Sequence, residues 1–154
     1  MNILKFSEAS RVCFLPPMSK EVTLKKLTDL SESYLYDKEK FLDALLEREK
    51  LMSTGMGFEI AYPHSKNRFV VDFFLTIGIS SAGINWNSFD GKNVKLIFLI
   101  GGLVEEQEKY LELLATLSNM VKRPENRDRM IHSGSESEFY EIFTELALKE
   151  NQAV

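Results

Sequence analysis

The sequence of 154 residues has little of what several common classes of protein require. It holds one cysteine, Cys13, and only two histidines. A single cysteine excludes an intrachain disulfide and a cysteine metal cage, and it is compatible with a reducing compartment. The longest apolar runs fall far short of the ~20 residues that a membrane-spanning helix needs. The N-terminal segment also lacks the pattern of a signal peptide. We therefore expect a soluble, cytoplasmic protein with no membrane insertion.

The sequence also has no excess of basic residues. The formal net charge is -4 and the isoelectric point is near 5.3. Basic and acidic residues are mixed along the chain rather than gathered in a stripe, which argues against nucleic acid as a partner. Apolar residues make up 44% of the chain, an ordinary composition for a globular protein. A chain of this size buries a single core, so the whole of 1–154 is expected to be one domain.

Apolar patterns along the chain alternate between strand-like runs and helical periodicity. Strands are predicted at 12–15, 58–62, 69–79 and 94–100, with the last two side by side. Helices are predicted at 20–34, from Asp37 to about Arg48, at 105–122, and after a possible capping box formed by Ser135 and Glu138. Pro124 is expected to end the third of these helices. Together these elements predict an α/β fold in three layers, a mixed sheet sandwiched between helices on both faces.

The segment 53–57 separates the second helix from the next strand, and its two glycines predict a loop with tight turns. It carries two hydroxyl groups, Ser53 and Thr54, and it follows Arg48 by a few residues. His64 comes soon afterwards, directly behind Pro63 at the end of a short apolar run. These groups are expected to lie close together.

One structural role and three chemical roles can be considered for His64. A histidine that closes a strand with local hydrogen bonds is the structural alternative. Metal binding is rejected because His132 has no ligand spacing to it and no cysteine or carboxylate cluster completes a set, so we expect neither metal nor cofactor. A hydrolytic triad lacks its nucleophile motif. The neighbours favour the imidazole itself as a nucleophile for a phosphoryl group, with Arg48 as a bidentate donor and Ser53 and Thr54 as further donors.

The stretch from Leu46 to Gly57, with Ile60-Ala61-Tyr62-Pro63-His64, resembles the active-site signature of the fructose/mannitol-type enzyme IIA domains of the bacterial phosphoenolpyruvate-dependent phosphotransferase system. That signature typically reads Arg-Glu, then Ser-Thr-Gly-Ile-Gly, then Ile-Ala-Ile-Pro-His, and the resemblance extends to the final helix. It implies the enzyme IIA mannitol-like fold. It also implies that His64 accepts a phosphoryl group from an HPr-like phosphocarrier as a tele-phosphohistidine, with Arg48 beside it.

Two residues depart from the family pattern. Tyr110 stands where many members have a second active-site histidine, so it can support a phosphate by hydrogen bonding but not by charge. Glu59 follows the glycine turn and would repel a phosphate if it pointed inward; the alternative is a solvent-facing carboxylate. Trp86 and Phe89 are predicted to serve packing, and His132 to lie on the surface.

Three functions follow as alternatives. The first is a nitrogen-type regulator whose phosphorylation state controls regulatory target proteins, which the stand-alone architecture favours. The second is a sugar-specific enzyme IIA that passes phosphate to a IIB component. The third is a binding module whose histidine is not phosphorylated, as Tyr110 and Glu59 suggest.

Overall fold

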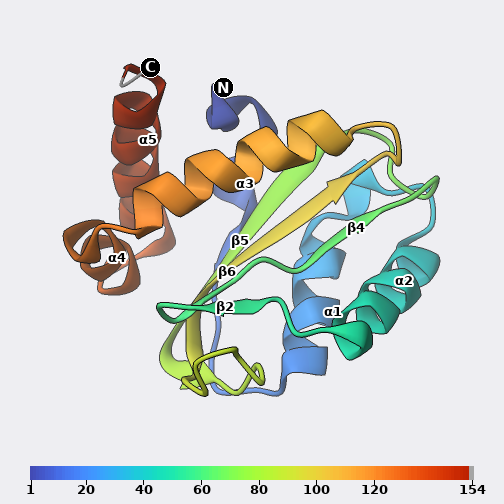
Figure 1. Cartoon of the computed structure of the whole chain (residues 1–154), viewed down its shortest axis with the longest axis horizontal. Coiled ribbons are helices and arrows are strands. Elements are labelled where there is room, and N and C mark those ends of the chain that lie inside the picture. Colours follow the sequence, from blue (N-terminus) through green and yellow to red (C-terminus); the bar gives the residue numbers. More distant parts are fainter. Residues whose placement is uncertain (153–154) are drawn as a thin grey trace.

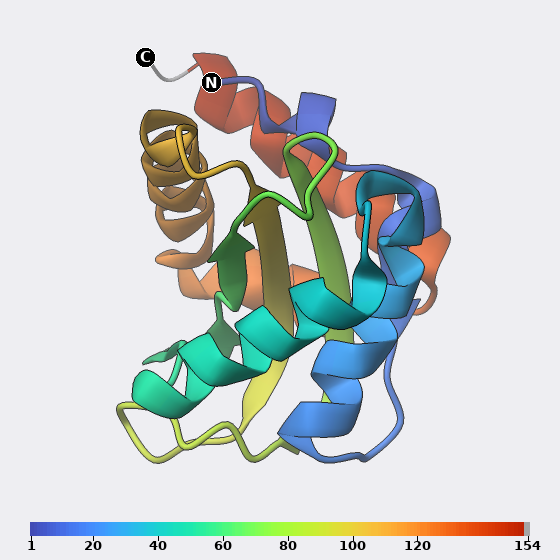
Figure 2. The same ribbon diagram turned by 90° about the vertical axis from the view of Figure 1, so that its right-hand side faces the viewer.

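A computed structural model, which describes residues 1–152, shows a mixed sheet with helices on both faces (Figure 1). Helices α1 (Lys20–Leu30) and α2 (Lys38–Leu51) cover one face, as the view in Figure 2 shows. Helices α3 (Gln107–Val121), α4 (Pro124–Ile131) and α5 (Glu136–Gln152) lie on the opposite side. The three-layer α/β prediction is confirmed. None of the helices within 1–152 is long and apolar enough to cross a membrane.

The sheet has six strands, β1 (Val12–Phe14), β2 (Gly55–Gly57), β3 (Ile60–Ala61), β4 (His64–Lys66), β5 (Phe74–Ile84) and β6 (Val94–Gly102). Its order is β1-β5-β6-β3-β2, and β4 also pairs with β6. Strands β5 and β6 are antiparallel neighbours, as predicted. Strand β1 runs parallel to β5, whereas β3 and β4 both run parallel to β6.

Strands β3 and β4 share one edge of β6, and the chain leaves the ladder between them. Ala61 pairs with Ile97, and pairing resumes when His64 meets Ile100. The interruption falls at Pro63, which has no N–H to donate to a ladder. The Pro63 carbonyl still accepts the Ile100 N–H at 3.0 Å. This break places His64 at the first position of β4.

Side chains of the two long strands alternate between two separate apolar cores. Leu75, Ile77 and Phe98 pack toward α3, α4 and α5, whereas Phe74 and Ile97 pack toward α1 and α2. All five are fully buried. Burial of a side chain of this kind contributes about 1.5–3 kcal/mol to folding. The site described below therefore rests on a sheet that is buried on both faces.

Helix starts follow the predicted caps more closely than helix ends follow the apolar pattern. Ser19 and Asp37 accept backbone N–H groups of Val22 and Lys40 at 3.2 and 3.1 Å. Helix α1, however, ends at Leu30 rather than at 34, and 32–34 is a 3-10 turn. The Ser31 hydroxyl donates to the Leu27 carbonyl and also bonds the Thr76 hydroxyl on β5, which fixes the helix end against the sheet.

The strand predicted at 69–79 begins late and ends late, at Phe74–Ile84. The Asn67 carboxamide accepts the Phe69 N–H at 3.0 Å and makes a local turn. Val70 is buried, yet it makes only an isolated bridge with Leu35. Val70 therefore packs on the core without joining the ladder, whereas Val71 is exposed.

Three further elements differ from the predictions. The segment 53–57 is not all loop, because Gly55–Gly57 forms the short strand β2. Strand β4 was not predicted at all. Pro124 does end the helical pattern before it, but it also begins α4, where its missing N–H costs nothing at the first helical position.

Candidate active site

A cavity of 270 Å³ opens between the end of α2, the segment 52–56, β4 and α3. All five of the residues predicted for the site lie in its wall. The lining consists of Arg48, Met52, Ser53, Thr54, Met56, Tyr62, His64, Tyr110, Leu114 and Ser118. Residues that are up to 70 positions apart in the chain therefore meet around His64.

The His64 ring is held through one of its two nitrogens. Nδ1 lies 3.0 Å from the Tyr62 carbonyl oxygen, and since a carbonyl only accepts, Nδ1 carries the proton. The Tyr110 hydroxyl lies 3.3 Å from the same Nδ1, and the two rings are 4.7 Å apart. Within residues 1–152, Nε2 makes no hydrogen bond. The neutral imidazole thus presents the lone pair of Nε2.

Three influences lower the pKa of His64. Partial burial is the largest, because it disfavours the charged ring, and the positive charges of Arg48 and Lys66 act in the same direction. The hydrogen bond to the Tyr62 carbonyl and the charge of Glu49 oppose them. The net result favours the neutral form, which is the form that can act as a nucleophile.

This lowered pKa predicts how the site responds to pH. We expect the His64 ring to titrate below ~6.5, the usual pKa of histidine, in an NMR titration of its ring protons. Because the unfolded chain then takes up the proton first as pH falls, the free energy of unfolding should also decrease below about pH 6.5. Replacing Arg48 by methionine removes one of the charges and should raise the titration midpoint. A midpoint above that of free histidine would contradict the assignment.

Arg48 lies in the last turn of α2 and reaches the cavity wall. Its Nη1 donates to the Met52 carbonyl at 3.3 Å, which holds the side chain across the helix end. A guanidinium has five N–H donors, so most of them are left for an anion. Burial raises the pKa of Tyr110 and lowers the pKa of His64; the Arg48 charge opposes the first effect and adds to the second. Arg48 is therefore electrostatically coupled to both rings.

Ser53 and Thr54 lie in the wall with their hydroxyl protons already donated. Ser53 Oγ donates to the Trp86 carbonyl at 2.6 Å. Thr54 donates its N–H and its hydroxyl to the Glu49 carboxylate at 2.8 and 2.5 Å. Direct donation from either hydroxyl to a phosphate stays a prediction, and it would require these bonds to break.

Two charged residues at the site, Lys66 and Glu49, were not predicted from the sequence. Lys66 follows His64 by two positions on β4, so the two side chains share a face of the strand, and its Nζ lies 4.7 Å from the centre of the Tyr110 ring. Recognition of β4 would have revealed it through this alternation. Glu49 belongs to the motif that carries the resemblance, but no role was assigned to it.

Two glycines of the 53–57 segment have structural reasons to be there. A Cβ on Gly55 would come within 2.9 Å of the Ser88 Cα, so a side chain at this position is excluded. Gly57 has a φ of +94°, in the region that favours glycine. The segment thereby turns from β2 into β3 and remains close to the 85–93 loop.

The other residues singled out from the sequence lie away from the cavity wall. Glu59 pairs with Lys95 at 3.3 Å and does not line the cavity, so its carboxylate does not face His64. Trp86 is fully buried, as predicted. Phe89 is 96% exposed, and the packing prediction for it was wrong. Its N–H bonds the Gly55 carbonyl, which fixes the backbone while the ring faces solvent.

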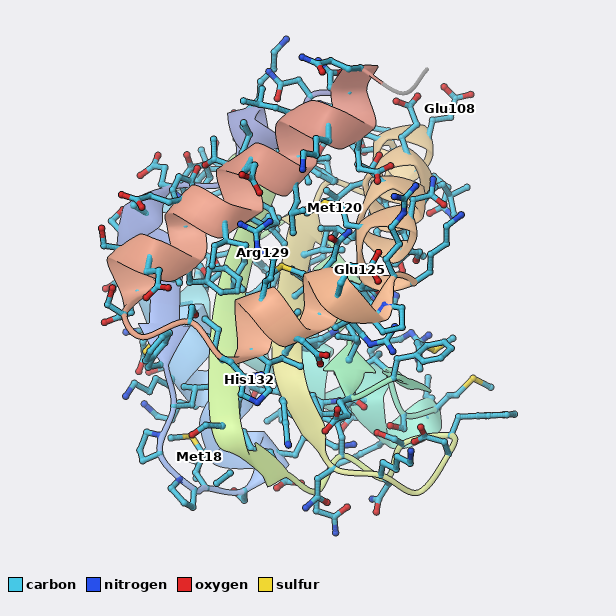
Figure 3. The ribbon with its side chains drawn as sticks, turned by 90° about the vertical axis from the view of Figure 1, so that its left-hand side faces the viewer. Met18, Glu108, Met120, Glu125, Arg129 and His132 are labelled. Atoms are coloured by element: carbon cyan, nitrogen blue, oxygen red, sulfur yellow. The ribbon has the colours of Figure 1, made fainter. Side chains whose placement is uncertain are left out.

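His132 is exposed at the end of α4 (Figure 3), as predicted for a surface residue. Its Nδ1 lies 2.9 Å from the Asp128 carbonyl one helical turn earlier. Nearby, Arg129 forms an ion pair with Glu145 of α5. The two histidines of the chain therefore occupy different surroundings, and only His64 lines the cavity with Arg48 and Tyr110.

The sequence profile of the family described as "Phosphoenolpyruvate-dependent sugar phosphotransferase system, EIIA 2" matches residues 10–146. The match covers the whole sheet and helices α1 to α4, and it extends into α5. The chain belongs to this family, whose members are phosphotransfer proteins.

Named relatives fall into two branches. The chain is 32% identical to the "PTS system fructose-specific EIIA component" of Haloferax volcanii, over 85% of this chain and 86% of that protein. It is 30% identical to the "Nitrogen regulatory protein" of Pseudomonas aeruginosa, over 86% of this chain and 87% of that protein. The crystal structure of nitrogen regulatory protein IIA-Ntr from Neisseria meningitidis has the same fold, with a TM-score of 0.83, 23% identity, and coverage of 90% and 96% of the two chains. The chain is thus related to both the sugar-specific and the nitrogen regulatory proteins.

Proposed function

We propose that this protein accepts a phosphoryl group on Nε2 of His64 from the phosphohistidine of an HPr-like phosphocarrier. The observation that carries the proposal is the hydrogen bond from Nδ1 to the Tyr62 carbonyl, because it leaves the lone pair on Nε2 in a ring that burial keeps neutral. Arg48 supplies positive charge beside that ring. Charge of this kind stabilises a phosphoryl group during transfer.

The transfer step needs no group beyond the two histidines. The Nε2 lone pair of His64 forms the new P–N bond while the P–N bond of the carrier breaks and its electron pair stays on the carrier imidazole. The proton on Nδ1 of His64 remains hydrogen-bonded to the Tyr62 carbonyl. A hydroxyl proton of Tyr110 is free for a phosphate oxygen, since Tyr110 can only accept from the protonated Nδ1. Lys66 adds a second positive charge close to Tyr110.

The surroundings of the cavity suit a protein partner. Large apolar side chains are exposed on the segments that frame it: Leu51, Met52, Met56, Phe58 and Leu111. Exposed apolar groups gathered in one region mark protein interaction sites, and methionine adapts well to more than one partner. We propose that the HPr-like carrier docks here, and that the downstream partner uses the same surface in turn.

Two downstream roles remain as candidates. The nitrogen-type regulator is supported by the relative in Pseudomonas aeruginosa. The sugar-specific role is favoured by a different observation: the fructose-specific relative matches over 86% of its own length, so a stand-alone architecture is found in that branch too. The two roles are separated by offering the phosphoprotein to a fructose-type IIB component. Transfer to IIB supports the sugar-specific role, and retention of the phosphate supports the regulator.

The proposal itself is tested by phosphorylation. We expect incubation with phosphoenolpyruvate, enzyme I and an HPr-like carrier to add one phosphate that is labile in acid and stable in base. Phosphorus NMR of the product should show substitution at Nε2. A protein that stays unlabelled while a known enzyme IIA in the same mixture is labelled would overturn the proposal and favour the non-phosphorylated binding module.

A further inference from the structure

A chain of hydrogen bonds connects a buried carboxylate to the His64 ring. The Glu49 carboxylate accepts both donors of Thr54, the N–H and the hydroxyl. The Thr54 carbonyl in turn accepts the Tyr62 N–H at 3.0 Å. The Tyr62 carbonyl then accepts Nδ1–H of His64, also at 3.0 Å. Glu49 thus holds, through two intervening residues, the acceptor that fixes the proton of the catalytic ring.

Glu49 is itself held from the far side of the cavity wall. Lys20 at the start of α1 donates to it at 3.0 Å, and the two side chains are only 11% and 4% exposed. The Trp86 indole N–H donates to the Thr54 hydroxyl at 3.1 Å. An ionised carboxylate only accepts, so Lys20 and the two donors of Thr54 satisfy Glu49 in a place where an unpaired charge would be costly.

Tyr62 lies where the ladder with β6 is interrupted, between the Ala61–Ile97 pair and the Pro63 carbonyl, which accepts the Ile100 N–H. Strands β2 and β3 pair only through Gly55 with Ala61 and Gly57 with Ile60, with an irregularity between the pairs. So short a ladder at a sheet edge is marginal in isolation. Tyr62 follows the last residue of β3, so its hydrogen bonds to Thr54 and His64 lie outside this ladder. The hydrogen bond from the Tyr62 N–H to the Thr54 carbonyl adds a contact at this interruption, and Glu49 anchors Thr54 from outside the sheet.

We propose that Glu49 is a positioning residue that sets the tautomer of His64: through Thr54 and the backbone of Tyr62 it keeps the proton on Nδ1 and the lone pair on Nε2. The N–H and the carbonyl of Tyr62 belong to two different peptide units, which are not conjugated with each other. Glu49 therefore acts on His64 by fixing the position of the Tyr62 carbonyl, not by passing charge along the backbone. The kinetic consequence rests on the proposed phosphoryl acceptance at Nε2. The tautomer itself is a property of the unphosphorylated protein.

The experiment measures the tautomer directly, from the nitrogen chemical shifts of His64 in the ¹⁵N-labelled unphosphorylated protein. Glu49→Gln keeps the shape, but its carboxamide offers one acceptor atom where the carboxylate offers two, so one donor of Thr54 loses its partner. We expect the population with the proton on Nε2 to rise several-fold. The rate of single-turnover phosphorylation at saturating carrier should fall roughly 10-fold with unchanged apparent carrier affinity, a loss at the lower end of that caused by removing residues that orient metal-binding histidines.

Matched variants separate this role from a general loss of stability. Glu47→Gln changes an exposed carboxylate on the same helical turn, which pairs with Lys50, and should leave both readouts unchanged. Thr54→Val removes only the hydroxyl and should shift the tautomer in the same direction as Glu49→Gln. Thr54→Ser retains that hydroxyl and should restore the parent tautomer. If Glu49→Gln fails to fold, the valine and serine pair decides the matter.

Unchanged tautomer populations in folded Glu49→Gln and Thr54→Val proteins would overturn the proposal. A shifted tautomer in a protein whose parent takes no phosphate would instead support the positioning role and reject the proposed function. The two hypotheses therefore fail in different measurements.

Discussion

Replacing His64 by alanine is expected to abolish phosphoryl labelling from the carrier, by a factor of at least about 10³, since loss of a nucleophile removes the covalent step altogether. The side chain is half-buried at the sheet edge and truncating it leaves both cores intact. Circular dichroism and the unfolding midpoint should therefore stay close to the parent values. Labelling is followed by intact mass and by acid lability.

His132→Ala is the matched control, because it removes the other histidine from an exposed position on α4. It should label at the parent rate. Labelling that persists in His64→Ala and disappears in His132→Ala would place the acceptor on the wrong side of the molecule and end the assignment of the cavity.

Arg48→Met is expected to have the second largest effect. It should slow phosphoryl transfer by about 10²–10³, the loss that follows when one preorganised donor to a developing negative charge is removed. Arg48→Lys keeps the charge but not the planar fork, so a smaller loss, about 10-fold, is expected. Both are measured as single-turnover rates with the purified phosphocarrier.

Lys50→Met serves as the control for Arg48. Lys50 lies two residues further along α2, is 74% exposed and pairs with Glu47. Its replacement changes the net charge by the same amount without altering the cavity wall. Equal losses in the two variants would mean that overall charge, rather than the Arg48 guanidinium, assists transfer.

The layers of the fold could be predicted because they depend on local periodicity. Helical spacing placed α3 near its true bounds, and the apolar run at 96–100 in β6 indicated a strand buried on both faces. Strand β4 has three residues and no apolar pattern. It forms because the edge of β6 is free beyond Pro63. Its prediction would have required knowledge of the partner strand.

The residues of the candidate site could be predicted from the sequence, but their hydrogen-bond partners could not. The motif contains Arg48, Thr54 and His64, and all three residues line one cavity. The donors of Thr54, however, are directed to Glu49, which the sequence alone could not show because hydrogen-bond partners depend on side-chain directions in three dimensions. Tyr110 was located by analogy with a helix position, and its hydroxyl lies within hydrogen-bond distance of His64.

Trp86 is the one tryptophan in the sequence, and its indole N–H is bonded to the Thr54 hydroxyl. Intrinsic indole fluorescence from this protein therefore originates at a single point directly behind the cavity, with no second tryptophan to dilute the signal. Any event that draws Thr54 away from the indole changes the polarity and quenching at that point. We expect Trp86 to act as an optical reporter, so that the proposed carrier docking and phosphoryl transfer can be timed in a stopped-flow instrument without an attached dye.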